Sequence, residues 1–181
     1  MVADRVLIWR FKRGSRKALC RIYEKYKDDL LKIAVALSND AAMAEDAVQE
    51  TFVRFAQRPE KVQTHGNLKG YLVTCVANRI RNARRDRQRH ETGCLAEADG
   101  MACSRRLPEQ WAVITEELER LRHALEQLPY EQREVVTLRM EADMTFRQIA
   151  ALQQASINTV QGRYRYGLAK LRSLLNGEVH S

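Results

Sequence analysis

The sequence predicts an all-α protein with two small helical domains joined by a flexible linker. Glycine and proline are scarce, at 8 and 3 among 181 residues, so few positions interrupt a helix. Apolar residues recur at helical spacing almost throughout, and no long stretch shows the alternating, β-branched pattern of strands. The helical pattern fails over 90–108, where two glycines, small residues and mixed charge predict a linker between domains at 1–89 and 109–181.

Three helices are expected in the first domain. They span residues 15–37, 41–57 and 67–87, with a connecting loop at 58–67. Ser15 and Asp40 are placed to cap the first two helices, because their side-chain oxygens can accept from unpaired backbone N–H groups. The predicted inward faces carry Leu19, Ile22, Tyr23, Tyr26, Leu30, Ile33, Leu37, Ala44, Val48, Phe52, Phe55, Leu68, Leu72, Cys75, Val76 and Ile80.

The second domain is expected to begin with an amphipathic helix after Pro108. The apolar positions of this helix are Trp111, Ile114, Leu118, Leu121 and Leu125. Pro129 is predicted to be the first residue of the next helix, since a missing backbone N–H costs nothing at that position.

Residues 145–172 predict two further helices joined by a tight turn. Thr145 and Gln148 form a capping box for the first helix, and Ser156 is a good cap for the second. Because the turn is short, the helices must cross sharply, as in a helix-turn-helix. The outward side chains of the second helix can read base edges or hold phosphates: Asn158, Thr159, Gln161, Arg163 and Arg165. The competing interpretation is a pair of core helices with a solvated outer face.

The overall charge favours a polyanionic partner. The formal charge is +8 and the isoelectric point about 9.6. No apolar run is long enough to span a bilayer, and the first residues lack a signal-peptide pattern, so a cytoplasmic protein with no membrane partner is expected. Cys20 and Cys75 are expected to pack as small hydrophobic residues in a reducing compartment.

Two helices carry opposite charges. Residues 79–89 contain six arginines and one acid, with Asn82 among them and Asn78 directly before them, which favours a nucleic-acid surface over a merely solvated face. Tyr71 adds an aromatic ring that could stack on an unpaired base. The helix over 41–57 instead presents a group of three acids and one amide, Glu45, Asp46, Gln49 and Glu50. This group indicates a docking site for a basic protein, or else a solubilising face whose acids are favoured by the helix dipole.

In this order and spacing, the motifs resemble bacterial RNA polymerase sigma factors of the extracytoplasmic-function (ECF) type. The segment AEDAVQETFVRF is similar to the part of region 2 in which an acidic helix binds the clamp helices of the polymerase β′ subunit. NLKGYLVTCVANRIRNARRDRQR is similar to the segment that melts and reads the minus-10 element. LEQLPYEQREVVTLRMEADMTFRQIA and SINTVQGRYRYGLAKLR look like region 4, which reads the minus-35 element.

The resemblance implies a sigma factor that acts by binding and not by catalysis. It would bind core RNA polymerase through the β′ clamp helices and the β flap, and direct promoter recognition and transcription initiation. No cofactor and no metal are expected, and an anti-sigma factor is a further candidate partner. The implied polymerase-binding residues are Glu45, Asp46, Gln49 and Glu50. The implied minus-10 residues are Tyr71, Asn78, Arg79, Arg81, Asn82 and Arg85. The implied minus-35 residues are Ser156, Asn158, Thr159, Gln161, Arg163 and Arg165.

The chain departs from the family pattern at a few positions. Tyr71 stands where the family often has Trp, and Met43 where it often has an acid. The turn before Ser156 lacks the usual glycine, so a left-handed residue there must be a non-glycine. Gly162 and Gly167 lower the helix propensity of the second helix, which is therefore expected to be less rigid than usual.

Two other classes of function and one candidate metal site compete with this interpretation. A helix-turn-helix regulator that does not bind core polymerase would explain residues 109–175 but not the first ninety. An enzyme is disfavoured, because none of the four histidines has a spaced carboxylate or cysteine partner that demands catalytic chemistry, and no glycine-rich phosphate loop is present. A zinc site at His90, Cys94 and Cys103 lacks an evident fourth ligand.

Overall fold

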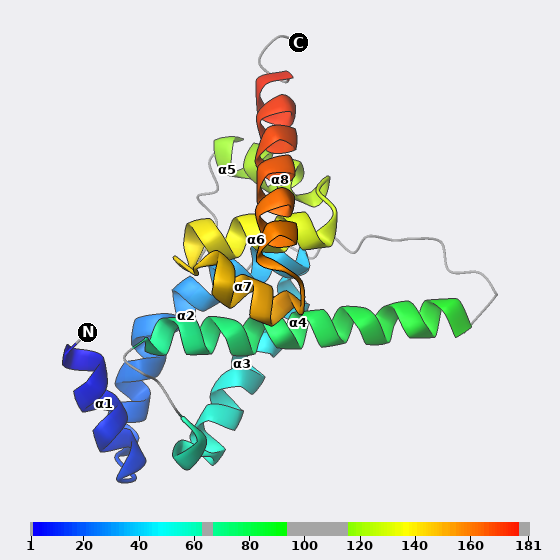
Figure 1. Ribbon diagram of the computed structural model, residues 1–181. Coiled ribbons are helices and arrows are strands. Elements are labelled where there is room, and N and C mark those ends of the chain that lie inside the picture. Colours follow the sequence, from blue (N-terminus) through cyan, green and yellow to red (C-terminus); the bar gives the residue numbers. More distant parts are fainter. Residues whose placement is uncertain (1, 63–66, 94–115, 178–181) are drawn as a thin grey trace. The chain divides into compact units, whose positions relative to one another are not determined.

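The computed structural model describes residues 2–62, 67–93 and 116–177, and within these ranges it contains helices and no strand. The elements in chain order are α1 (Val2–Lys12), α2 (Arg16–Ser38), α3 (Ala41–Gln57), the 3₁₀ helix η1 (Pro59–Lys61), α4 (Leu68–Gly93), α5 (Glu116–Glu126), α6 (Tyr130–Glu141), α7 (Phe146–Gln153) and α8 (Ile157–Gly177) (Figure 1). The all-α prediction is confirmed. None of the described helices has the length and apolar character that crossing a lipid bilayer requires.

The chain divides into two compact units, Met1–Ser104 and Arg105–Ser181. Residues 94–115, which include most of the predicted linker together with Cys94, Cys103, Trp111 and Ile114, lie outside the described residues. The limits 1–89 and 109–181 therefore stay a prediction.

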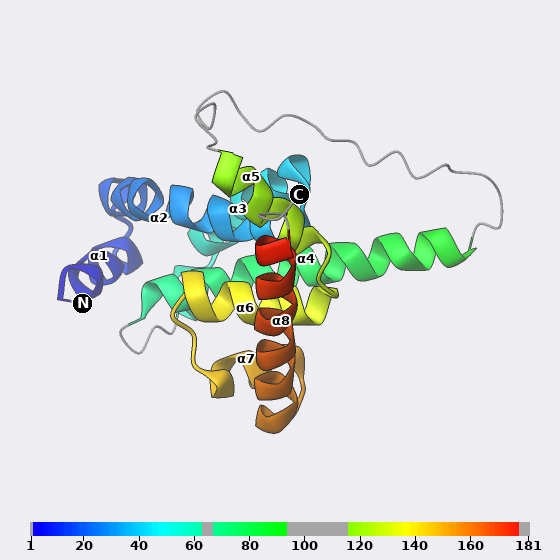
Figure 2. The same cartoon turned by 90° about the horizontal axis from the view of Figure 1, so that it is seen from above.

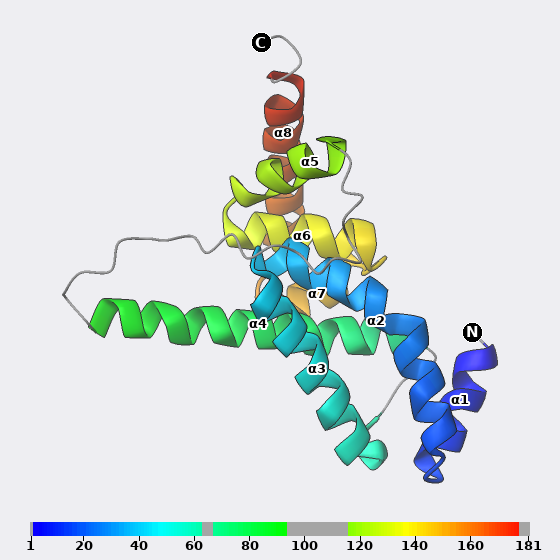
Figure 3. The same cartoon turned by 180° about the vertical axis from the view of Figure 1, so that it is seen from behind.

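The core of the first unit is built by α2, α3 and α4, which pack against one another (Figure 3). Both predicted caps are confirmed, because Ser15 Oγ accepts from the Ala18 N–H at 3.3 Å and Asp40 Oδ1 from the Met43 N–H at 3.1 Å. The largest fully buried side chains of the three helices are Ile22, Leu30, Ile33, Leu37, Leu68, Leu72, Val73 and Ile80. Most of the predicted inward stripes are therefore buried.

Two residues of α2 depart from the predicted packing. Tyr23 is 43% exposed, because it flanks the buried stripe, although its ring meets Phe52 edge-on with centroids 4.9 Å apart. Cys20 is exposed, so its predicted burial was wrong. Cys20 precedes the buried Ile22 by two positions, which at 100° per residue places it on the opposite side of the helix.

A helix that the sequence pattern did not predict, α1, packs against α2 (Figure 2). Asp4, Ile8 and Phe11 are buried. The Phe11 ring stacks on Phe55 of α3, with ring centroids 4.6 Å apart. Lys25 Nζ lies 2.6 Å from Asp4 Oδ1. Burial raises the pKa of Asp4, but the hydrogen bond from Lys25 leads a set of contacts that lower it by more, so the net pKa lies below its ordinary value of 3.8.

The long helix α4 begins as predicted and ends later. Asn67 Oδ1 accepts from the Gly70 N–H at 2.9 Å, which caps the first turn. The predicted end was near Arg87, but the helix continues to Gly93. The intervening residues contain no proline or glycine before that position, so nothing in the local sequence interrupts the helix.

The second unit packs α5, α6 and α8 around a cluster of Ala124, Leu128, Val136 and Leu171. The predicted apolar face of α5 is only partly correct, because Leu118 is 53% and Leu121 is 39% exposed while Ala124 is buried. Pro129 is the N-cap of α6 and not its first residue, a difference of one position.

The helix-turn-helix is formed by α7 and α8, and its capping box is present. Thr145 Oγ1 accepts from the Gln148 N–H at 3.3 Å, and Gln148 Oε1 accepts from the Thr145 N–H at 2.8 Å. Ser156 Oγ accepts from the Thr159 N–H at 3.0 Å and caps α8. Gln154 closes α7 with φ of 53°, so the left-handed residue is a non-glycine, as predicted. Ile157 is 41% exposed, because it begins α8 ahead of the buried Val160.

The two glycines of α8 have different surroundings. Gly167 is buried against α6, and a Cβ there would lie 3.0 Å from Val136 Cγ2 and 3.4 Å from Gln132 Cβ. A Cβ at Gly162 would meet no atom within 4 Å. The expectation that both glycines loosen α8 is therefore too simple, because Gly167 lets α8 approach α6 closely.

Candidate functional site

The predicted acidic residues lie on the side of α3 that faces away from the core. Ala44, Ala47 and Val48 are buried, and the helical repeat then turns positions 46 and 49 outward. Asp46 and Gln49 are exposed, whereas Glu45 and Glu50 are half-buried.

A groove of about 620 Å³ runs between α3 and α4. We call it the α3–α4 groove; it is lined by Asp40, Ala42, Met43, Asp46, Ala47, Gln49, Glu50, Val53, Arg79, Ile80, Ala83 and Arg87. Three of the four predicted polymerase-binding residues line it, and Glu45 does not. The lining mixes small apolar side chains with both signs of charge, so an amphipathic helix of a partner protein fits its chemistry.

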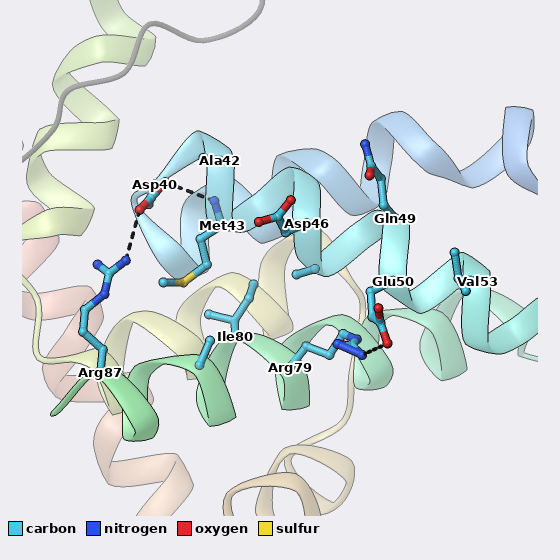
Figure 4. Close-up of a pocket in the computed structure, with 12 residues that line it drawn as sticks. Asp40, Ala42, Met43, Asp46, Gln49, Glu50, Val53, Arg79, Ile80 and Arg87 are labelled. Atoms are coloured by element: carbon cyan, nitrogen blue, oxygen red, sulfur yellow. Dashed lines mark hydrogen bonds and ion pairs between the residues drawn. The ribbon is translucent and has the colours of Figure 1, made fainter. Parts of the chain in front are cut away.

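Ion pairs join α3 to α4 at two places along the groove (Figure 4). Glu50 Oε1 lies 2.5 Å from Arg79 Nη2, and Asp40 Oδ2 lies 3.6 Å from Arg87 Nη2. Arg54 Nε also donates to Glu50 at 2.8 Å. This hydrogen bond, together with the charge of Arg79, lowers the pKa of Glu50. Figure 4 shows Glu50 directed at Arg79, while Gln49 points away from α4. Glu50 is thus engaged within the unit, and Asp46 and Gln49 are its outward neighbours.

A second, smaller cavity of about 300 Å³ also lies between α3 and α4. We call it the Tyr71 pocket; it is lined by Thr51, Arg54, Phe55, Arg58, Tyr71, Cys75, Asn78, Arg79 and Asn82. Four of the six predicted minus-10 residues, Tyr71, Asn78, Arg79 and Asn82, line this one cavity. The half-buried Arg81 and the exposed Arg85 do not line it.

The chemistry of the Tyr71 pocket suits a planar, polar ligand. Phe55 and Tyr71 place their ring centroids 6.4 Å apart. Burial raises the pKa of both Tyr71 and Cys75, so at neutral pH the phenol keeps the proton that it can donate. The amides of Asn78 and Asn82 can both donate and accept hydrogen bonds. Aromatic faces beside such amides can stack on an unpaired base and read its edge.

The predicted minus-35 residues on and beside α8 differ in their surroundings: three are exposed, two form the helix cap, and Arg163 is hydrogen-bonded to Gln153. Asn158, Gln161 and Arg165 are exposed. Ser156 and Thr159 are also exposed, but their hydroxyl oxygens lie 2.8 Å apart within the cap of α8. These two hydroxyls therefore already hold the start of the helix.

Arg163 is half-buried, and a chain of hydrogen bonds connects it to α6. Its Nη1 donates to Gln153 Oε1 at 2.6 Å, and Gln153 Nε2 donates to Glu134 Oε2 at 2.8 Å. The Tyr130 hydroxyl donates to the other oxygen of Glu134 at 3.0 Å. Glu134 is 1% exposed. The network therefore anchors the arginine to a buried carboxylate across the turn of the helix-turn-helix.

The sequence did not predict several residues of the Tyr71 pocket and of the hydrogen-bond network behind α8. Arg54 and Arg58 line the Tyr71 pocket, and their spacing of four residues at the end of α3 was a signal for a shared face. Gln153 and Glu134 had no comparable local signal, because 19 positions separate them along the chain. In the part of the chain that the structure describes, no group of three His, Cys, Asp or Glu side chains is placed to hold a metal.

Comparison with known proteins agrees with this arrangement. The family model Sigma-70 region 2 matches residues 22–90, and Sigma-70, region 4 matches residues 118–171. The ECF RNA polymerase sigma factor SigL of Mycobacterium tuberculosis is 32% identical over 90% of this chain and 92% of its own length. EcfG of Rhodopseudomonas palustris, also an ECF sigma factor, is 29% identical over 84% of this chain and 86% of its own.

Two solved structures share the fold. RpoE of Bartonella quintana, crystallised with the anti-sigma factor NepR, matches with a TM-score of 0.70, 24% identity and coverage of 88% of this chain and 98% of its own. CnrH, in complex with the cytosolic domain of CnrY, matches with a TM-score of 0.67, 23% identity and coverage of 97% and 98%.

A helical unit with an acidic helix beside an arginine-rich one, followed by a helix-turn-helix unit, defines a sigma factor. The chain belongs to the ECF RNA polymerase sigma factors. It binds core RNA polymerase and promoter DNA and directs transcription initiation. The rival interpretation, a helix-turn-helix regulator that does not bind polymerase, explains only the second unit and is not favoured.

Proposed function

We propose that the α3–α4 groove is the surface that binds core polymerase, through the β′ clamp helices. The observation that supports this is the exposure of Asp46 and Gln49 beside a groove with apolar lining, on a chain whose net charge is +8. An exposed acid beside apolar surface is complementary to a basic amphipathic helix. Glu50 contributes indirectly, by fixing Arg79 and hence the spacing of the two helices.

The Tyr71 pocket is proposed to hold an unpaired base of the minus-10 element. This proposal depends above all on one observation, that Tyr71, Asn78, Arg79 and Asn82 line a single cavity. Extruding a base from the duplex costs a few kcal/mol, which stacking and hydrogen bonds in a pocket can offset. Arg81 and Arg85, outside the pocket, would then hold the phosphate backbone.

The outer side of α8 is proposed to read the minus-35 element. Asn158 and Gln161 are exposed in its first two turns, the part that reaches base edges in this motif. Arg165 is exposed one turn later and suits a phosphate. Arg163 is proposed to contact DNA in an orientation that Gln153 and Glu134 determine, while Ser156 and Thr159 hold the helix start against the DNA.

The two units are proposed to act as separate modules with limits at 1–89 and 109–181. The second unit would also contact the β flap of polymerase. The protein would act in the cytoplasm, without catalysis and without a cofactor. An anti-sigma factor is proposed as a further partner, since RpoE, which shares the fold, was crystallised with one.

Run-off transcription with purified core polymerase, followed by mapping of the start sites, tests the function directly. The full chain should direct initiation from a defined set of promoters, and core polymerase alone should not. The Tyr71→Ala variant should still bind core polymerase but open promoters poorly. If Tyr71→Ala opens promoters as well as the unchanged chain, the pocket assignment is wrong.

A further inference from the structure

A strongly basic surface covers α1 and the first turn of α2, apart from the surfaces described above. Residues 5–17 contain six Arg or Lys and no Asp or Glu, a net +6 on a chain whose total is +8. We call this surface the α1 basic face; its exposed members are Arg5, Val6, Trp9, Arg10, Lys12, Arg13, Arg16 and Lys17. The Sigma-70 region 2 model begins at residue 22 and so does not include it.

The α1 basic face combines charge with an exposed aromatic ring. Trp9 is 54% exposed and Val6 is 44% exposed, on the side of α1 opposite its buried residues. The guanidinium of Arg13 lies 4.1 Å from the centre of the Trp9 ring. An aromatic ring among cations can stack on a base while the cations hold phosphates.

A merely solvating role explains this surface poorly. Solvated helical faces commonly mix both signs of charge, whereas this one has a single sign. Arg16 and Lys17 also lie in the first turn of α2, which contains no acid. Cations at that end of a helix oppose its dipole and destabilise it. Arg10 and Lys12 lie in the last turn of α1, where the dipole of that helix favours cations. Arg16 and Lys17 are therefore the part of the face that is unfavourable for the fold alone and favourable for an anionic partner.

The position of α1 identifies which polyanion the face can reach. Phe11 of α1 stacks on Phe55 at 4.6 Å, and Phe55 lies 6.4 Å from Tyr71. Phe55 and Tyr71 both line the Tyr71 pocket. The helix that carries the basic face thus packs against a wall of the proposed base pocket through its buried side, where Phe11 lies. The basic face is on the other side of the same helix, one helix diameter, ~10 Å, from that wall. A single strand that leaves the pocket can therefore reach the basic face only by running past α1.

We propose that the α1 basic face binds the unpaired promoter strand next to the segment held in the Tyr71 pocket. The basic side chains hold its phosphates, and Trp9 stacks on one of its bases. This inference rests on the proposed function of the pocket, and it adds a second contact to the same strand. The partner is single-stranded DNA and not duplex, because an exposed indole can stack only on a base that is unpaired.

The test uses holoenzyme assembled from the full chain and core polymerase, with fluorescein-labelled forked DNA from a promoter mapped by run-off transcription. In the short probe the unpaired strand ends with the minus-10 element, and in the long probe it continues for about ten nucleotides, within the usual site size of single-strand binders. The unchanged chain should bind the long probe more tightly. Trp9→Ala/Arg13→Ala should lose about 10-fold or more on the long probe and nothing on the short one.

Matched variants separate stacking, charge and folding. Trp9→Phe keeps an aromatic face and should retain most of the long-probe affinity. Lys32→Ala removes one positive charge from an exposed site farther along α2 and should change neither probe. Arg13→Ala alone should reduce the slope of the logarithm of the binding constant against the logarithm of the salt concentration by about 0.7 on the long probe, as expected for one lost phosphate contact. Unchanged circular dichroism shows that each variant folds.

The outcomes distinguish this inference from the proposed function. If the unchanged chain binds both probes equally, or if the double variant loses affinity equally for both, the α1 basic face does not bind the strand. If the double variant instead loses binding only to vesicles of phosphatidylglycerol, the face binds a lipid surface and the inference is overturned. A failure of the pocket proposal has another signature, in which Tyr71→Ala leaves short-probe binding unchanged.

Discussion

Gly162 and Gly167 lie five residues apart in α8, and alanine is expected to have opposite effects at the two positions. At Gly162 a Cβ would meet no atom within 4 Å. Alanine there only restricts the unfolded chain and raises helix propensity, which should stabilise the second unit by about 0.5–1 kcal/mol.

At Gly167 the same propensity gain meets a steric cost. A Cβ would lie 3.0 Å from Val136 Cγ2, closer than van der Waals contact, and Val136 is only 2% exposed within the core cluster. Overpacking a tight core costs about 1–3 kcal/mol. Subtracting the propensity gain of about 1 kcal/mol leaves a net destabilisation of about 0–2 kcal/mol. The two variants should therefore differ by about 1–3 kcal/mol.

The assay must report on the second unit, because a two-unit chain need not unfold in one transition. Amide hydrogen exchange of peptides from α6 and α8, measured on the full chain, meets this need. Thermal unfolding should agree, at about 4–8 °C for each kcal/mol in a unit of this size.

A double variant isolates the contact itself. Val136→Ala removes the methyl groups that the new Cβ would meet, so it should reduce the additional cost of Gly167→Ala. If Gly167→Ala stabilises the unit as much as Gly162→Ala does, the close approach of α8 to α6 is wrong.

Three further predictions concern the binding surfaces and α1. Asp46→Lys should weaken core polymerase binding at least about tenfold without changing helical circular dichroism, since the new positive charge repels a basic partner. If the variant competes for core polymerase with the affinity of the unchanged chain, the groove assignment is wrong. Gln161→Ala should cost about 1–3 kcal/mol only on upstream elements with the preferred base, while Arg165→Ala should weaken all elements and lower the salt slope by about one. If Gln161→Ala and Arg165→Ala weaken binding equally on every upstream element, α8 binds DNA without reading its sequence. The pKa of Asp4 in the folded protein lies below its ordinary value of 3.8. The ionised Asp4 carboxylate therefore stabilises α1 fully above pH 3.8, and this stabilisation is lost as the pH falls through the lowered pKa. The Asp4→Asn variant should show the same loss of stability at pH 7, measured as faster amide hydrogen exchange over residues 2–12. If the exchange rates are unchanged, the ion pair with Lys25 does not stabilise α1.

Local signals were sufficient for much of the fold and for part of the site. Ser15, Asp40, Thr145 and Ser156 were predicted as caps, and each accepts the expected backbone hydrogen bond. These interactions join residues three positions apart, so the sequence specifies them without knowledge of the remaining chain. The family motifs likewise depend on contiguous segments, which is why the class of protein was predictable.

The prediction missed α1 because its stability is not local. A helix of eleven residues is marginal alone in water. It forms here against α2 and through the stacking of Phe11 on Phe55, a residue 44 positions further along the chain. The pattern of residues in one sequence does not show that Phe11 and Phe55 come into contact.

The sequence by itself determined the helices other than α1, their caps, the tight turn before Ser156 and the chemical character of each surface. Tertiary structure alone decided which of those side chains are available to a partner. Glu50 is joined to Arg79 and Arg163 to Gln153, whereas Asp46 and Gln161 remain exposed. The physical reason is range: helix periodicity and capping act over three or four residues, whereas ion pairs and pockets require segments that only folding brings together.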